Sequence, residues 1–297
     1  MQKLVTLVTI CLLFYIGIIL DDNQAGAVTN STYTKPQVDI KTVKNEKVLE
    51  FTLLLDNKVN KISIPVSKLL FNVTITKKYD GKGDSHQFKL DPKFTKLYEE
   101  VGNFKFQKNT VVIYPIFTQA GYEKDGFYDY YSKKCGSRCL TVPIPVNPKP
   151  TYQSSATGGL VLSMLNYTFI TDVDVDKNPS ILQKYSKVIL LHNEYVTKKE
   201  FDAIIKHPNV VYSYPNALYA EVKTDYLKNT ITLVKGHGYP SANISNGFNW
   251  KFDNSQFEYD FDCKSWKFYK IKNGKMLNCY PYYRILYDEN LLRAITN

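Results

Sequence analysis

Short, uncharged apolar segments alternate with helix-like segments through the middle of this chain. TVVIYPIF (110–117) carries no charge, KVILL (187–191) is apolar after its lysine, and NVVY (209–212) begins a further segment of this kind. A strand that is apolar at nearly every position is buried on both faces, as in the parallel sheets of α/β proteins. Residues 106–225 are therefore predicted to form an α/β domain, flavodoxin-like and three-layered, with a parallel central sheet.

Helices are predicted between these strands. One begins near Ser154 in SSATGGLVLSMLNY, and a short one spans NPSILQKY (178–185). A third follows Thr197, whose spacing to Glu200 matches the T-x-x-E capping box. The segment YTFITDVDV (167–175) is predicted to be a strand over its whole length.

Both flanks of this domain are predicted to be β-rich. VLEFTLLL and VNKISIPV, within residues 48–66, flank a turn signal and predict a hairpin, and FNVTITKKYDGKG (71–83) predicts a strand ending in a glycine turn. Polar residues 28–45 are expected to be a mobile lead-in. The predicted regions are a signal peptide (1–27), an N-terminal β-rich region (28–105), the α/β domain (106–225) and an aromatic β-rich extension packed on it (226–297).

The N-terminus has the pattern of an export signal. Lys3 is followed by an uncharged apolar segment, Leu4 to Leu20, and Ala25-Gly26-Ala27 has the small-x-small form of a cleavage site. Cleavage after Ala27 is predicted. The alternative is an uncleaved membrane anchor, because the apolar segment approaches the length that spans a bilayer. Either way, the protein is expected to be secreted or at the cell surface, outside the cytoplasmic membrane.

Cysteine usage agrees with export. Beyond the signal segment the chain has Cys135, Cys139, Cys263 and Cys279, an even number that fits disulfides in an oxidising compartment. The local pairs Cys135–Cys139 and Cys263–Cys279 are favoured because each closes a short loop. A zinc site of four thiolates is the alternative, although these spacings fit common zinc motifs poorly.

The charge of the chain does not predict a nucleic-acid partner. The net charge of +10 comes from lysines that are dispersed along the sequence, without a block of like charges or a cluster of arginines. Nucleic-acid-binding proteins usually concentrate such charges on one face or segment.

Polar side chains follow three of the predicted strands. Open parallel sheets bind ligands at the carboxyl ends of their strands, so these side chains predict a functional site. The residues are Pro115 to Tyr122 after the first strand, Asp172, Asp174 and Asp176 around the end of the second, and His192, Asn193, Glu194 and Tyr195 after the third.

The usual nucleophiles and nucleotide motifs are missing from these positions. No cysteine follows any of the strands, and the patterns G-x-S-x-G, G-x-G-x-x-G and the P-loop are absent from the sequence. Carboxylate, imidazole and phenol groups remain. Hard oxygen ligands suit iron or another hard metal, which could lower the pKa of a water molecule and make it a nucleophile.

Two motifs carry a resemblance to a known family. TQAGYEKDGFYDYY (118–131) resembles the T-W-x-A-Y-N…G-G-x-S-L-Y region of the large (β) subunit of N,N-dimethylformamidase. LLHNEYVTKKEFDAI (190–204) resembles its G-H-P-E-Y-W-S…M-x-D-A-L segment. The resemblance covers about residues 109–225 and implies a class I glutamine-amidotransferase-like domain. Asn193 stands where the family motif has proline, and Gln119 and Val196 lie near the places of its tryptophans.

The resemblance also implies a chemistry. Characterised members are amidohydrolases with a mononuclear iron that is held by tyrosine phenolates and a glutamate. Carried over, Glu194, Tyr122 and Tyr114 are the predicted metal ligands, with Tyr128 as the other option for the second tyrosine. His192 and Glu194 are the predicted catalytic residues, and the near-neutral pKa typical of histidine suits His192 to position water or move protons. No residues for an organic cofactor are predicted.

Two functions are consistent with the sequence. The first is an exported hydrolase of a small-molecule amide C–N bond that depends on iron. The second is a non-catalytic extracellular or cell-surface binding protein that kept the fold and lost the metal. His237, in KGHGYP, is a further candidate site residue, although a loop histidine is more often structural.

Overall fold

The computed structural model describes residues 33–43, 45–55, 58–77, 84–105, 108–146, 155–252 and 260–297. The predicted signal peptide with its alternative as an anchor, and the glycine turn ending at residue 83, lie outside these residues. Within them, no helix combines the length and the apolar character that crossing a bilayer requires.

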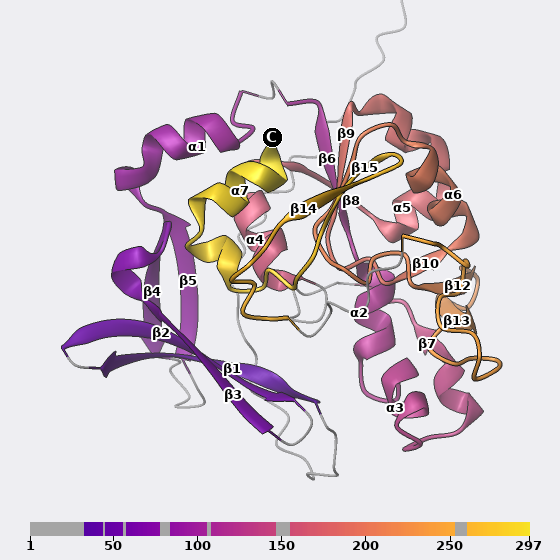
Figure 1. Ribbon diagram of the computed structural model, residues 1–297. Coiled ribbons are helices and arrows are strands. Elements are labelled where there is room, and N and C mark those ends of the chain that lie inside the picture. Colours follow the sequence, from indigo (N-terminus) through magenta and orange to yellow (C-terminus); the bar gives the residue numbers. More distant parts are fainter. Residues whose placement is uncertain are drawn as a thin grey trace, which may run out of the picture.

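The N-terminal region contains two small antiparallel sheets and a helix, on the left of Figure 1. One of these sheets has the order β1-β2-β3, and the other is the hairpin β4–β5. The elements are β1 (Tyr33–Val43), β2 (Glu46–Leu55), β3 (Lys58–Pro65), β4 (Phe71–Lys77), β5 (Asp84–Leu90) and α1 (Thr95–Val101). The hairpin predicted within residues 48–66 is confirmed as β2–β3.

Strand β1 was not expected, because its residues belong to the polar lead-in of the sequence prediction. It pairs with β2 along most of its length and forms one edge of the sheet. Edge strands commonly carry charged residues, which discourage pairing with other molecules. The polar composition of Tyr33–Val43 is therefore compatible with a strand at this place.

A six-stranded sheet with the order β14-β15-β11-β9-β6-β8 forms the centre of the molecule. All neighbours from β15 to β8 are parallel, and only β14 runs antiparallel to its neighbour β15. The protein is therefore mixed α/β with a largely parallel central sheet. The strands are β6 (Thr110–Tyr114), β8 (Thr168–Thr171), β9 (Lys187–Leu190), β11 (Val210–Tyr212), β14 (Phe268–Ile271) and β15 (Gly274–Leu277).

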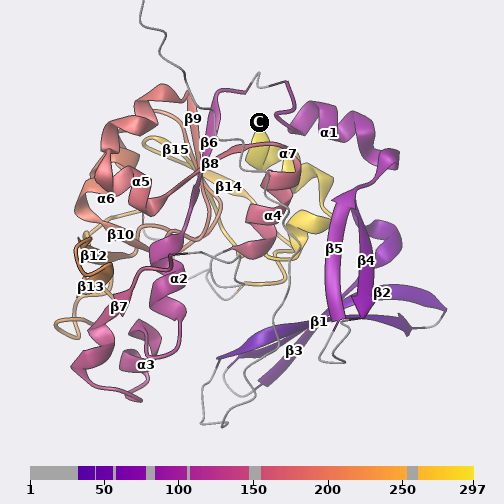
Figure 2. The same ribbon diagram turned by 180° about the vertical axis from the view of Figure 1, so that it is seen from behind.

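Helices cover both faces of this sheet because successive side chains of each strand point to opposite faces. Val112 and Ile189 pack in one core with helices α4 and α7, whereas Val111 and Val188 pack in another with α5 and α6. Figures 1 and 2 show these two layers from opposite sides. The helices are α4 (Ala156–Met164), α5 (Asp172–Lys177), α6 (Lys198–Lys206), α7 (Glu289–Thr296) and the 3-10 helix η4 (Pro179–Lys184).

Another sheet, called the second sheet below, lies beside helix α2 and was not predicted from the sequence. It has the order β10-β12-β13-β7, and its apolar side chains share a core with Phe117 of α2 and Phe127 of α3. The elements are α2 (Ile116–Tyr122), α3 (Phe127–Tyr131), β7 (Thr141–Pro143), β10 (Tyr195–Thr197), β12 (Ala220–Asp225) and β13 (Thr230–Lys235). This sheet brings the loop after β13 next to the loop after β9.

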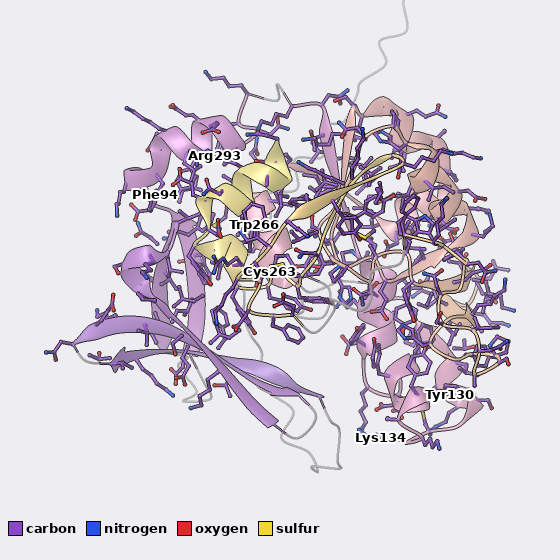
Figure 3. All side chains as sticks on the ribbon, in the orientation of Figure 1. Phe94, Tyr130, Lys134, Cys263, Trp266 and Arg293 are labelled. Atoms are coloured by element: carbon purple, nitrogen blue, oxygen red, sulfur yellow. A yellow bond between two sulfur atoms is a disulfide. The ribbon has the colours of Figure 1, made fainter. Side chains whose placement is uncertain are left out.

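The C-terminal region is joined to the α/β core by a strand rather than by packing alone. The hairpin β14–β15 extends the central sheet, with β15 parallel to β11. Helix α7 then crosses to the N-terminal region, where Arg293, labelled in Figure 3, forms an ion pair of 2.9 Å with Glu100 of α1.

The cysteines form the two local pairs that the sequence favours. Cys135 is bonded to Cys139, and Cys263 to Cys279. All four sulfur atoms are used in these bonds, so the four-thiolate zinc site does not form. Disulfides of this kind are compatible with a protein outside the cytoplasm.

The segment predicted as a strand over residues 167–175 is divided between two elements. Strand β8 ends at Thr171, and α5 begins at Asp172. The reason is a capping box: the Thr171 side chain accepts from the Asp174 amide, and the Asp174 carboxylate accepts from the Thr171 amide. Asp172 therefore lies in the first turn of a helix.

A substitution at Gly274 tests the joint between β15 and β11. An added Cβ would lie 1.8 Å from the carbonyl oxygen of Val210, so Gly274→Ala has to push the two strands apart. The expected loss in the free energy of unfolding is about 2–3 kcal/mol, measured by urea denaturation. Gly136→Ala is the matched control, because no atom lies within 4 Å of its Cβ position, and a change below about 0.5 kcal/mol is expected there. Equal effects of the two substitutions would contradict this role of Gly274.

Candidate functional site

The candidate site lies at the carboxyl ends of β6 and β9. Strand β8, the next strand of this sheet along the chain, is on one side of β6, and β9 is on the other. The loops after β6 and β9 therefore leave the sheet on either side of the point where the strand order reverses, which is where open α/β sheets bind ligands. The loops after β6 and β9 converge as the sequence predicted, whereas Asp174 caps α5 and Asp176 accepts from Thr197, outside the site.

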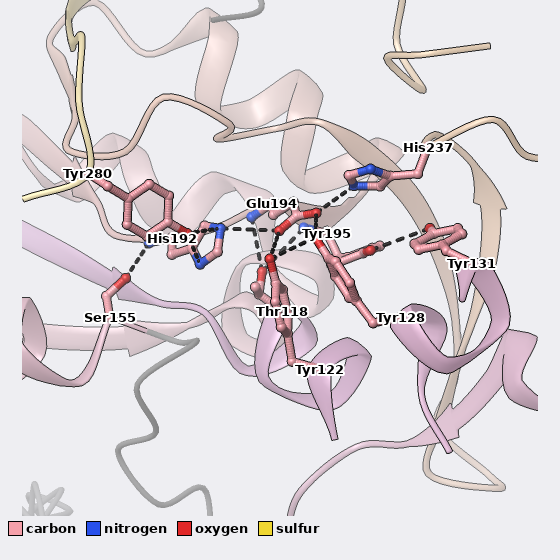
Figure 4. A network of polar contacts seen from close by, with 10 residues as sticks. All are labelled: Thr118, Tyr122, Tyr128, Tyr131, Ser155, His192, Glu194, Tyr195, His237 and Tyr280. Carbon is pink, nitrogen blue, oxygen red and sulfur yellow. Dashed lines mark hydrogen bonds and ion pairs between the residues drawn. The ribbon is translucent and has the colours of Figure 1, made fainter. Parts of the chain in front are cut away.

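The carboxylate of Glu194 is the centre of the site, and none of its surface is exposed (0%). Oε2 accepts a hydrogen bond of 2.8 Å from Tyr122 and lies 3.1 Å from Nε2 of His192. Oε1 accepts a hydrogen bond of 3.0 Å from Tyr128 and lies 2.5 Å from Nε2 of His237. Figure 4 shows that these four side chains surround the carboxylate.

The four partners come from separate parts of the chain. Tyr122 ends α2, Tyr128 lies in α3, and His192 precedes Glu194 in the loop between β9 and β10. His237 belongs to the loop after β13, in the second sheet. A single carboxylate thus links the central sheet, the helices after β6 and the second sheet.

The backbone of the Glu194 loop is fixed from two sides. The hydroxyl of Thr118 accepts the amide N–H groups of Glu194 and Tyr195 at 2.9 and 3.2 Å. Asn193 donates a side-chain hydrogen bond of 2.6 Å to Asp172, which also accepts the amide of Phe117 at 2.8 Å. Asp172 therefore connects the loop after β9 to the start of α2.

The imidazole of His192 is held by aromatic rings, and only 1% of this residue is exposed. The Tyr214 ring stacks on it at 5.5 Å, and the Tyr280 ring meets it edge-on at 5.0 Å. The Tyr280 hydroxyl lies within 2.7 Å of the ring nitrogens, and the backbone amide of His192 donates to Ser155 at 2.7 Å. Tyr280 directly follows Cys279, so the disulfide Cys263–Cys279 anchors this contact.

The charges of the site favour an ionised Glu194 and neutral phenols. Burial alone would raise the pKa of Glu194, but the charge of His237 and the hydrogen bonds from His192 and His237 hold that pKa well below its ordinary value. Burial and the negative charge of Glu194 raise the pKa of Tyr122 well above 10. Tyr122 is therefore a neutral hydrogen-bond donor to a carboxylate anion.

A second group of carboxyls is buried next to the site. Burial raises the pKa of Asp172 to about 7, although several hydrogen bonds oppose the shift. Burial and the charge of Asp172 raise the pKa of Glu200 well above its usual range. The two side chains are both fully buried, so we infer that they hold at least one proton between them at neutral pH. The charge of Asp176 also raises the pKa of Glu200, while Asp176 itself accepts hydrogen bonds from Thr197, Thr224 and Tyr226.

The structure brings together most, but not all, of the residues proposed from the sequence. Glu194, His192 and Tyr122 meet in one network, and Tyr128 is the second tyrosine that hydrogen bonds to Glu194. Tyr114, the other option, ends β6, and its ring packs against Gly159 of α4.

Two contributors were underestimated or missed in the sequence. His237 was treated as a loop histidine, and Tyr280 was one of many tyrosines in an aromatic region. For His237, the sequence offers the pattern Gly236-His237-Gly238, since flanking glycines favour a left-handed backbone. In the structure all three residues do adopt positive φ angles, of 128°, 51° and 76°. No comparable local sign marks Tyr280.

The oxygen atoms of the site are compatible with a hard metal ion. The two phenol oxygens of Tyr122 and Tyr128 lie 2.7 Å apart, and each lies within 3.0 Å of a Glu194 oxygen. Bonds of about 2.0–2.1 Å in octahedral geometry would place neighbouring ligand oxygens about 2.9 Å apart. In the described part of the chain, no three His, Cys, Asp or Glu side chains are grouped for a metal, so a metal at Glu194 would need phenol ligands.

Comparisons with known proteins add no relative to this description. No model of a protein family matches the chain, and no curated protein resembles it significantly. The resemblance to N,N-dimethylformamidase remains a prediction from the two motifs.

Replacing Glu200 tests the proton that it shares with Asp172. A carboxyl group whose pKa is higher in the folded than in the unfolded protein stabilises the folded state only while it is protonated there. Its contribution is lost as the pH rises from the unfolded pKa, near 4, through the folded pKa, which is about 7 for Asp172. The free energy of unfolding should therefore fall over this range in the wild type. In Glu200→Gln the fall should be smaller by on the order of 1 kcal/mol per pH unit, because one titrating group is gone.

The measurement is urea denaturation from pH 5 to 8. Glu99→Gln is the control, because Glu99 is an exposed glutamate on α1 and its replacement should leave the pH profile unchanged. Parallel profiles for the wild type and Glu200→Gln would show that the carboxyl pair does not share a proton.

Proposed function

We propose that this protein is an exported, N,N-dimethylformamidase-like hydrolase of a small-molecule amide C–N bond that depends on iron. One observation carries the proposal: two phenols and two imidazoles from separate segments converge on the fully buried carboxylate of Glu194. Carboxylate and phenol oxygens are hard ligands of the kind that iron accepts, and imidazoles can transfer protons near neutral pH.

The arrangement of the sheet supports the proposed fold family. Along the sheet, the parallel strands β8-β6-β9-β11-β15 have the order 2-1-3-4-5 when they are numbered along the chain. This is the order of flavodoxin-like sheets, in which ligands bind beside the first and third strands. Glu194 follows the third of these strands and Tyr122 follows the first, as a glutamine-amidotransferase-like domain of this type would require.

Glu194, Tyr122 and Tyr128 would hold the metal. When bound, an iron ion would supply a Lewis acid that polarises the amide carbonyl and lowers the pKa of a water molecule. Thr118 and Asn193 would keep the carboxylate in position, because Thr118 accepts from the backbone amide of Glu194 and Asn193 ties the same loop to Asp172 of α5. Tyr128 is a better candidate than Tyr114 for the second phenol ligand, since it hydrogen bonds directly to Glu194.

His192 would move the protons that amide hydrolysis requires. Water gives its oxygen to the acyl carbon, and the departing nitrogen must gain a proton. Nε2 of His192 lies 3.1 Å from Glu194, and the aromatic rings around it restrict its orientation. Such a fixed imidazole next to a carboxylate suits a general base and acid.

Two disulfides support export, and the final location would be the cell surface or the medium. The proposed signal peptide and its alternative as an anchor differ only in whether the protein stays attached to the membrane.

One observation favours a second function. Each oxygen of Glu194 already contacts two protein donors, so the network is complete without a metal. The alternative is therefore a non-catalytic extracellular or cell-surface binding protein in which this network serves structure or ligand recognition.

Metal content distinguishes the two functions. The mature protein, purified from a metal-replete host, should contain about one iron per chain, and a visible phenolate-to-iron absorption band should accompany it. Glu194→Ala and the milder Glu194→Gln should lose most of this iron, because each removes a charged ligand. Iron and zinc would be measured by elemental analysis.

The control and the tyrosine variants refine the test. Glu221→Gln changes a glutamate of β12 outside the network and should keep the metal. Tyr122→Phe and Tyr128→Phe should each weaken or shift the absorption band, whereas Tyr114→Phe should not. A folded wild type without metal, with no difference from Glu194→Ala, would reject the metalloenzyme and favour the binding protein.

A further inference from the structure

The imidazole of His237 is enclosed by tyrosine rings. The ring centroid of His237 lies 4.4 Å from that of Tyr219, 5.1 Å from Tyr131, 5.8 Å from Tyr195 and 6.0 Å from Tyr128. These four rings are called the tyrosine box below.

The tyrosine box has a carboxylate at its inner end and reaches the surface at its outer end. Oε1 of Glu194, which is fully buried, lies 2.5 Å from Nε2 of His237. The side chain of His237 is 18% exposed, and Tyr131 and Tyr128 are half-buried. The imidazole of His237 therefore extends from the partly exposed end of the box to the buried carboxylate.

The chemistry of the box suits a flat organic cation. The faces of aromatic rings attract a cation that lies within about 6 Å of the ring centroid, and the attraction grows when water is excluded. The carboxylate adds a charge-assisted hydrogen bond to an N–H donor. Several rings around one carboxylate are the elements with which proteins recognise ammonium-type ligands.

The backbone holds His237 in this place at a conformational cost. Its φ angle of 51° is in the left-handed region, between Gly236 and Gly238, which also have positive φ. The loop is fixed by hydrogen bonds from the His237 amide to Ser245 and from the Gly238 amide to Ile244, at 2.9 and 2.7 Å. Non-glycine residues keep such angles where the surroundings impose them, and they are common at functional sites.

We propose that the tyrosine box above Glu194 is a binding site for a small planar organic cation, of the guanidinium, amidinium or imidazolium class, and that His237 is its tethered internal occupant. An external cation of this class competes with His237 for Oε1 of Glu194. The site needs Glu194 and the tyrosine rings but no metal, so the proposal does not depend on the hydrolase described above.

The experiment uses methylguanidinium as the probe and methylurea as its neutral counterpart of the same planar shape. Binding is measured on the mature protein in the presence of EDTA, by calorimetry and by the NMR shifts of tyrosine ring protons. His237→Gly removes the internal occupant, and glycine accepts the left-handed backbone without strain. This variant should bind methylguanidinium saturably and at least tenfold more tightly than the wild type, because no tethered group competes.

Two controls define the site. The double variant His237→Gly/Glu194→Gln should bind methylguanidinium at least tenfold more weakly than His237→Gly, since it lacks the carboxylate charge. Methylurea should not saturate any variant. Equal binding of methylurea and methylguanidinium, or no saturable binding to a His237→Gly protein with native near-UV circular dichroism, would overturn the proposal.

If His237→Gly does not fold, the wild type decides. There, millimolar methylguanidinium should shift the ring signals of Tyr131 and Tyr219 saturably, and methylurea should not. Absence of this difference in the wild type would equally reject the cation site. Metal content, measured on separate untreated samples, reports on the hydrolase independently of this result.

Discussion

A carboxylate that has lost all contact with solvent can stay ionised only when protein donors replace the water around it. Glu194 meets this condition with four donors, and the sequence distance between the first and the last of them exceeds one hundred residues. Removing these donors would leave the buried charge of Glu194 without compensation, which costs several kcal/mol. The helices after β6, the loop after β9 and the loop after β13 are therefore held to one point by electrostatics as well as by packing.

The same constraint explains why the second sheet and the C-terminal region contact the central α/β layer so closely. The second sheet contributes His237 to one oxygen of the carboxylate, and the C-terminal region contributes Tyr280 to the imidazole that contacts the other. Neither region is therefore structurally independent of the central α/β layer. Each one completes the surroundings of a side chain that belongs to the loop after β9.

The sequence predicted those features that depend on local patterns. Apolar strands such as KVILL, and the N-cap Thr197, give signals within a few residues, and the parallel sheet, helix α6 and the convergence of strand ends on Glu194 follow from them. The division between β8 and α5 was missed because the capping box at Thr171 was read as part of a strand. Strand β1 was missed because its residues are polar, although its partner β2 follows directly in the chain. The places of β7 and β10 in the second sheet, and the contact of Tyr280 with His192, depend on partners that are distant in sequence, and no local pattern reports such partners.

The place of β15 in the central sheet has a consequence for synthesis. Strand β11 is made first, and its partner on the outer side comes from residues more than sixty positions later in the chain. In a nascent chain that has not yet reached Gly274, β11 is an open edge of the sheet, and its unpaired backbone groups can pair with other chains. Completion of the sheet next to β11 therefore depends on residues that are synthesised long after β11 itself.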